Sequence, residues 1–170
     1  MHRQIQIAPL ILFVLVAAMM LPMPMTPTVS AEPERMDWSA RIADMDQALK
    51  RGDLAATQAA WREAYVAAHV SHGWPAMIAV GDAAMRASGL VGAQISEAHA
   101  RRAYLTALLR ARRQGSLDGV LAAGDSFGRL GDQAVVKQAL SVATDLAERS
   151  GDGAARRRVQ LFQTQWAPRT

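Results

Sequence analysis

Cysteine is absent from this 170-residue chain. Its absence excludes disulfides, thiolate-bound zinc or iron–sulfur clusters, covalently attached haem and catalysis by a thiol. Because no disulfide can brace the fold, stability must come from the packing of side chains and backbone.

Aromatic residues are scarce as well, at 5% of the chain, although 51% of its residues are hydrophobic. Alanine and leucine supply most of that hydrophobic share, and both residues favour helices. The sequence has no alternating polar and apolar run long enough to predict a sheet. These features together predict an all-α fold.

The chain has little excess charge of either sign, and its formal net charge is only +4. Proteins that bind nucleic acid normally carry a dense basic face. We therefore expect no nucleic-acid partner.

Motifs for catalysis and phosphate binding are missing too. Ser126 lies in the run Gly124–Gly128, where the flanking glycines superficially resemble the nucleophile elbow that carries a catalytic serine. That motif must follow a strand, whereas this segment is predicted to be helical. No glycine-rich phosphate loop follows a strand. The sequence therefore predicts a protein that is not an enzyme and holds no cofactor.

Two histidines are weak candidates for metal ligands. His69 and His72 are three residues apart at a predicted helix end, where a histidine also favours the helix dipole. No acidic residue or cysteine completes a ligand set by its spacing, so we predict no metal site. A metal-binding or small-ligand accessory protein using these histidines is the alternative function.

The first 31 residues have the features of a secretory signal peptide. Met1–Gln6 contains one arginine, Ile7–Leu21 is almost entirely apolar, and Val29–Ala31 ends in small residues. This order predicts cleavage after Ala31 and a periplasmic or secreted protein. The alternative is an uncleaved anchor, although the apolar run is shorter than the roughly 20 residues that span a bilayer.

A short linker, residues 32–36, precedes a predicted helical domain that covers residues 37–170. Glycine followed by aspartate or serine recurs through this domain, as expected where one helix ends and the next is capped. The predicted helices are Asp37–Arg51, Leu54–Val70, Trp74–Ser88, Gln94–Gln114, 117–130, 133–150 and 153–166. Their short connections predict antiparallel neighbours.

The segment Val120–Arg149 resembles the tetratricopeptide repeat (TPR), a helix hairpin of 34 residues. The matching positions are Gly124 and Phe127 in its first helix, Gly131-Asp132 at the turn, and Leu140 and Ala143 in its second helix. Glu148 departs from the family, which often has proline there. Two earlier hairpins match more loosely, through Met45, Ala48, Trp61 and Ala64, and through Gly81, Ala84, Tyr104 and Ala107.

This resemblance implies a short right-handed α-solenoid of about three TPR-like helix pairs with a C-terminal capping helix. A generic helical bundle is the alternative. In the capping helix, Arg156–Arg158 precede an apolar stripe formed by Val159, Phe162 and Trp166. The stripe predicts a helix that covers the end of the stack, or else one that lies on anionic lipid.

One pattern recurs in the first helix of each pair: a hydrophobic residue, an acid four residues later and a base four residues after that. The residues are Ile42, Asp46 and Lys50; Ile78, Asp82 and Arg86; and Leu121, Asp125 and Arg129. An acid four residues before a base favours an ion pair within one helix. In TPR proteins these positions line a concave groove for peptides, so the resemblance implies a groove here. The alternative is a solvated helix surface.

The sequence thus predicts an exported, non-catalytic adaptor that binds a protein or peptide partner of the cell envelope. Membrane contact is expected only through an uncleaved leader or the basic C-terminal helix. A purely structural subunit of an envelope complex remains a further alternative.

Overall fold

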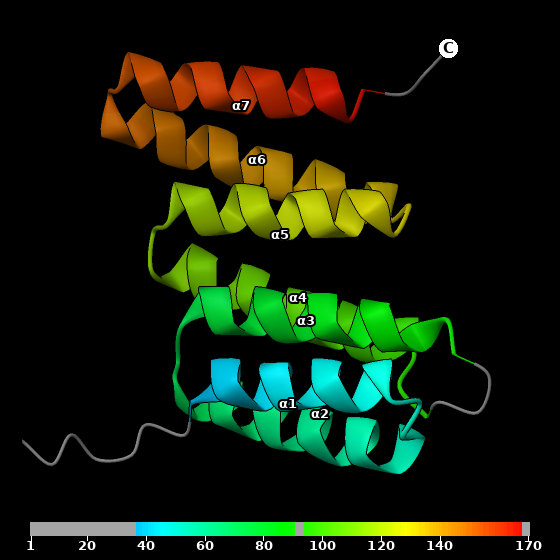
Figure 1. The fold of residues 1–170 in the computed structure, drawn as a ribbon. Helices are drawn as coiled ribbons and strands as arrows, with labels where there is room; N and C mark the ends of the chain where they lie inside the picture. The colour runs from blue at the N-terminus through cyan, green and yellow to red at the C-terminus, as the bar shows by residue number, and fades with distance from the viewer. Residues whose placement is uncertain (1–36, 91–93, 168–170) are drawn as a thin grey trace, which may run out of the picture. The chain divides into compact units, whose positions relative to one another are not determined.

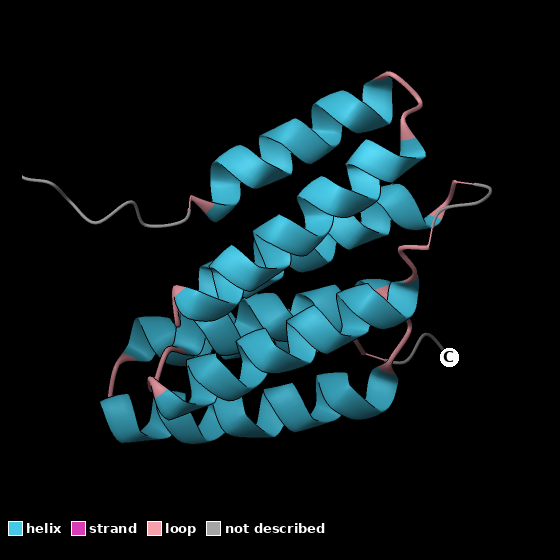
Figure 2. Cartoon of the chain, turned by 90° about the horizontal axis from the view of Figure 1, so that it is seen from below, coloured by secondary structure: helices cyan, strands magenta, loops and turns pink. Residues whose placement is uncertain are grey.

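The computed structural model describes residues 37–90 and 94–167. The predicted signal peptide and linker lie outside these residues. Within them the chain forms seven helices and no strand (Figures 1 and 2). The helices are α1 (Trp38–Lys50), α2 (Leu54–Val70), α3 (Trp74–Ser88), α4 (Glu97–Arg113), α5 (Leu117–Arg129), α6 (Gln133–Ser150) and α7 (Gly153–Gln165). The predicted all-α class is confirmed.

Local capping explains the helix boundaries. The side chains of Asp53, Ser116 and Asp152 accept hydrogen bonds from backbone N–H groups at the starts of α2, α5 and α7. Glycines with positive φ follow four helices, Gly151 among them with φ 68°. A left-handed residue at this position is the common way to end a helix, and glycine adopts it without steric cost.

The predicted start of the fourth helix, at Gln94, is wrong by three residues. The helix starts at Glu97 because Ser96 is its N-cap. The backbone N–H of Ser96 donates to Nδ1 of His99 at 3.2 Å. Histidine thus takes the place of the glutamate that usually completes this reciprocal cap.

Consecutive helices pack against each other as pairs, α1 with α2, α3 with α4 and α5 with α6, and α7 packs on α6. The first helices of these pairs also contact one another in succession, α1 with α3 and α3 with α5, and α5 goes on to contact α7. The backbones of the second helices do not approach each other as closely. We call the surface formed by α1, α3 and α5 the first-helix face.

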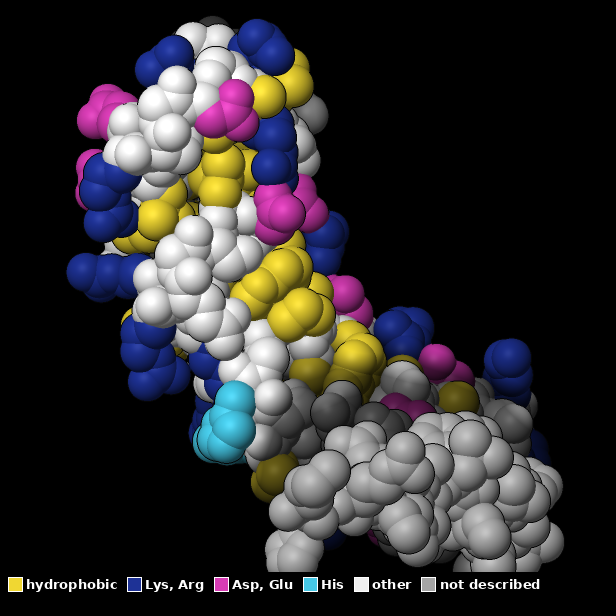
Figure 3. Space-filling view, turned by 90° about the vertical axis from the view of Figure 1, so that its left-hand side faces the viewer, with side chains coloured by type: hydrophobic (Ala, Val, Ile, Leu, Met, Phe, Trp, Pro, Cys, Tyr) yellow, Lys and Arg dark blue, Asp and Glu magenta, His cyan; other side chains and the backbone are white. Residues whose placement is uncertain are grey.

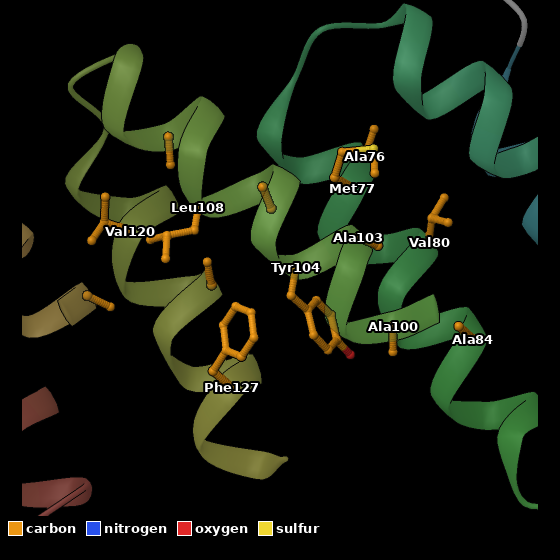
Figure 4. Packing of buried hydrophobic residues seen from close by; sticks show 14 of the residues in the cluster. Ala76, Met77, Val80, Ala84, Ala100, Ala103, Tyr104, Leu108, Val120 and Phe127 are labelled. Atoms are coloured by element: carbon orange, nitrogen blue, oxygen red, sulfur yellow. The ribbon is translucent and has the colours of Figure 1, made fainter. Parts of the chain in front are cut away.

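Alanine fills most of the core, so the few large side chains decide its geometry. Tyr104 and Phe127 are 1% exposed and meet edge to face, with ring centroids 6.1 Å apart. Figure 4 shows the two rings facing each other between α4 and α5. Edge-to-face pairs of this kind are favourable beyond their buried area.

Glycines let the C-terminal helices approach α5. A methyl group at Gly124 would lie 2.7 Å from Phe162 of α7 and 2.9 Å from Ala139 of α6, and one at Gly128 would lie 2.4 Å from Trp166. The predicted close contact at Gly124 is present, with Ala139 rather than Ala143 beside it.

The apolar stripe of α7 is consequently turned inward. Val159 and Phe162 are each 6% exposed. The stripe packs on α5 and α6. Among the helices described, none is long and apolar enough to cross a membrane.

Candidate binding face

The nine residues of the predicted groove lie on the first-helix face. Ile42, Ile78 and Leu121 are half-buried and pack against the edge of the core. The acids are half-buried and the bases exposed. The structure therefore brings the three rows onto neighbouring helices.

The charged residues pair differently from the prediction. Arg86 donates from Nε and Nη2 to both carboxylate oxygens of Asp46, at 3.1 and 3.0 Å, and so joins α3 to α1. Arg129 donates to Asp82 at 3.1 Å and joins α5 to α3 in the same way. Only Asp125 and Arg129 form the predicted pair within a helix.

The series continues into α7, where Gln165 donates to Asp125 at 2.8 Å. We call these linked residues the carboxylate ladder: Asp46–Arg86, Asp82–Arg129 and Asp125–Gln165. Each carboxylate accepts a hydrogen bond from the next helix in the series α1, α3, α5 and α7. Lys50 makes no ion pair within residues 37–90 and 94–167. The in-helix pairing predicted for Asp46 and Asp82 is wrong because a long arginine side chain spans the gap between adjacent helices.

The ladder is partly open to solvent. Arg86 and Asp46 have 44% and 35% of their side chains exposed, and Arg129 and Asp82 have 52% and 41%. Water screens such pairs, so each contributes at most about 1 kcal/mol to folding. Figure 3 shows acidic and basic side chains alternating along the right-hand side of that view.

Asp82 has a further partner inside the protein. Tyr104 reaches from α4 and donates its hydroxyl hydrogen to Oδ1 of Asp82 at 2.7 Å. Burial raises the pKa of Tyr104 above its usual range, and the hydrogen bond to Asp82 raises it further. The core therefore fixes the orientation of the middle carboxylate of the ladder.

A cavity of about 230 Å³ opens beside the ladder, between α1 and α3. Its lining residues are Trp38, Ser39, Ile42, Ala79, Asp82 and Arg86. It therefore brings together three predicted groove residues, Ile42, Asp82 and Arg86. Its walls combine apolar side chains with one acid and one base, a mixture typical of a site for a polypeptide side chain. Leu121 and Arg129 do not line it.

A larger cavity, of about 520 Å³, lies against α4 and α6. Its lining residues are Arg112, Val142, Asp145, Leu146, Glu148 and Arg149, none of which was predicted as a site residue. Acids and bases are balanced in this lining, which selects neither an anion nor a cation.

Arg110 is an important residue that the sequence analysis did not single out. A basic residue in the last turn of α4 would ordinarily offset the dipole of that helix. Instead its side chain is buried, at 5% exposure, and donates to the backbone oxygens of Ala68, His69 and Gly73 at 2.8–3.1 Å. It thus satisfies carbonyl groups where α2 ends. Burial, followed by the charge of Arg113, lowers its pKa.

The histidines considered as metal ligands are both exposed. His72 has a φ of 56° and occupies the turn after α2. His69 lies beside Tyr65, with ring centroids 6.0 Å apart. In the part of the chain that the structure describes, no group of three or more His, Cys, Asp or Glu side chains gathers as metal ligands would.

Comparisons with known proteins identify no relative. No family model matches the chain, and no curated protein or solved structure shows a significant match to it.

Proposed function

We propose that this chain is an exported, TPR-like adaptor that binds a segment of a partner protein on its first-helix face. Two features support a TPR-like arrangement: the helices pack in consecutive pairs, and the first helices of the pairs contact one another in succession. The adaptor is non-catalytic in this proposal, and its partner belongs to the cell envelope.

The observation that carries the proposal is the cavity beside the carboxylate ladder. Ile42 supplies an apolar wall, while Asp82 and Arg86 supply one charge of each sign at its margin. A short polypeptide segment offers matching groups, because it combines apolar side chains with backbone donors and acceptors. The ladder holds Arg86 in a defined position and so lowers the entropy lost when a partner binds.

The export part of the proposal rests on the leader alone, through the apolar run Ile7–Leu21 and the small residues that end at Ala31. A protein that begins at Glu32 in the periplasm of its host is the expected product. Detection of the intact leader in the membrane fraction would contradict cleavage and would favour an adaptor that is tethered to the membrane.

A selection from a random peptide library on phage tests the binding site. Ala79 lines the cavity, and Ala79→Phe should fill it. Peptides selected on the unaltered chain should bind this variant at least about 10-fold more weakly, since the loss of one buried contact group costs about 1.4 kcal/mol or more.

Ala98 provides the matched control, because it is an exposed alanine on α4. Ala98→Phe should leave the affinity for the same peptides unchanged. If the peptides bind Ala79→Phe normally and Ala98→Phe poorly, the binding site lies on the second helices and the assignment to the cavity is wrong. A selection that yields no peptide at all would count against a peptide-binding function.

A further inference from the structure

The outer surface of α4 carries a line of residues that contribute nothing to the core. Arg102, Leu105, Leu109 and Arg113 follow one another at intervals of three or four, which places them on one face of the helix. All four are exposed, and Leu105 and Leu109 retain 46% and 50% of their surface. We call these four residues the outer stripe.

The arginines of the outer stripe are free to bind a partner. The ladder arginines, Arg86 and Arg129, are engaged with aspartates. By contrast, Arg102 and Arg113 form no ion pair with any other described residue. Glu97, in the first turn, is the sole acid of α4. Nothing on this helix therefore neutralises the two charges.

A similar line lies on α2. Arg62, Val66 and Val70 are spaced four residues apart and exposed, with Val66 at 52% and Val70 at 57%. Arg110 fastens α4 to the C-terminal end of α2, so the two helices are held together on this side. Exposed aliphatic side chains interspersed with free arginines thus cover two neighbouring second helices.

We infer that the outer stripe of α4 docks onto an anionic lipid surface. Arginines at both ends would bind phosphate groups, and the two leucines between them would enter the interface, as in helices that lie on membranes. Arg102 and Arg113 are 11 residues apart, or about 16 Å along the helix, which matches a broad charged surface. Neither the cavity between α1 and α3 nor the larger cavity against α4 and α6 is lined by Leu105 or Leu109. A lipid surface can bind these two leucines without a cavity.

The absence of cysteine allows a specific test on the full chain. Leu105→Cys places a single thiol in the stripe, and an NBD fluorophore attached there reports entry into a bilayer. Phosphatidylcholine vesicles containing phosphatidylglycerol should shift its emission to the blue, whereas phosphatidylcholine alone should not. High salt should reverse the shift, because it screens exposed charges.

Leu161→Cys on α7 is the matched control, since Leu161 is 70% exposed outside the stripe. A label at this position should not respond. Adding Arg102→Glu and Arg113→Glu to the Leu105→Cys chain should weaken partitioning by about 20-fold or more, because each basic residue near an anionic surface contributes about fivefold. Neither substitution removes an ion pair or a core contact, so unfolding should change only slightly, through the loss of a basic residue at the C-terminal end of α4.

Three results would overturn the inference. Equal shifts at positions 105 and 161 would place the whole chain, or its leader, at the membrane without preference for the stripe. A shift that survives Arg102→Glu and Arg113→Glu would exclude recognition of charge. A shift produced by poly-glutamate but not by anionic vesicles would assign the stripe to an acidic protein partner.

Discussion

Tyr104 donates its hydroxyl hydrogen to Oδ1 of Asp82 over 2.7 Å, and so a core residue of α4 fixes a carboxylate on the opposite helix of its pair. The same oxygen accepts from Arg129 of the following pair at 3.1 Å. One aspartate therefore links three helices, α3, α4 and α5. The candidate binding face and the hydrophobic core meet at this point.

Tyr104→Phe should destabilise the protein by about 1 kcal/mol, the usual net contribution of a hydrogen bond. The ring would still pack against Phe127, so no cavity is created. Denaturant unfolding at neutral pH measures the change. An unchanged free energy of unfolding would mean that water replaces the hydroxyl at Asp82 without loss.

The same pair of proteins should differ at alkaline pH. The pKa of Tyr104 is raised in the folded state, whereas in the unfolded chain it is about 10. Below pH 10 both states keep the proton, and the stabilisation is complete. Above about pH 10 the unfolded chain loses its proton first, so stability falls by up to about 1.4 kcal/mol per pH unit. The Tyr104→Phe variant has no hydroxyl at this position, so its free energy of unfolding should fall less steeply above about pH 10. Denaturant unfolding at several alkaline pH values compares the two proteins.

The ladder pair of Asp46 and Arg86 should behave as an exchangeable charge pair. Arg86→Asp places two carboxylates together and should cost about 1 kcal/mol, a modest sum because both side chains are partly exposed. Adding Asp46→Arg to that variant should restore most of the loss. A double-mutant cycle followed by thermal unfolding measures the coupling. If the exchanged pair is no more stable than Arg86→Asp alone, the two side chains do not interact in solution.

The helices were predictable from sequence because their ends are specified locally. Asp53 and Ser116 cap the next helix within four residues, and glycines such as Gly151 end the preceding one. The partners of the charged residues were not predictable in the same way. Arg86 and Asp46 are 40 residues apart, and their contact depends on how two helix pairs stack.

Arg110 eluded the sequence analysis for a different reason. Its partners are backbone oxygens 37 to 42 residues away, and backbone groups leave no mark in a sequence. The rows of acids and bases were recognised as belonging to one face because they recur at matching places in three helices. The cavity between α1 and α3 was beyond prediction because it depends on how these two helices lie against each other.

Gly124→Ala should lower stability, contrary to the effect expected for an exposed helical glycine. The new methyl group would lie 2.7 Å from Phe162 and 2.9 Å from Ala139, so α6 or α7 would have to move. Overpacking of this kind costs about 1–3 kcal/mol. Gly89 has nothing within 4 Å of an added methyl group, and Gly89→Ala should be neutral or stabilising by up to about 1 kcal/mol. Melting temperatures compare the two variants, and a higher value for Gly124→Ala would contradict the packing of α7 on α5.

Arg110→Met should be among the most damaging single changes in the chain. The guanidinium donates to Ala68, His69 and Gly73. Methionine would fill part of its volume but would remove this donor from all three oxygens, leaving the oxygen of Ala68 only the hydroxyl of Ser71. Since hydrogen bonds from charged groups contribute about 1.5–3 kcal/mol each and part of the loss is recovered by water, we expect a loss of about 2–4 kcal/mol.

Arg113→Met is the matched control, because Arg113 is exposed on the same helix and makes no ion pair among the described residues. Its unfolding free energy should change by less than about 0.5 kcal/mol. Hydrogen exchange would locate the damage: amides at the end of α2 should lose protection first in Arg110→Met, since that is where the lost donor acted. Loss of protection spread evenly over all helices would instead show that Arg110 supports the fold as a whole rather than the junction of α2, α3 and α4.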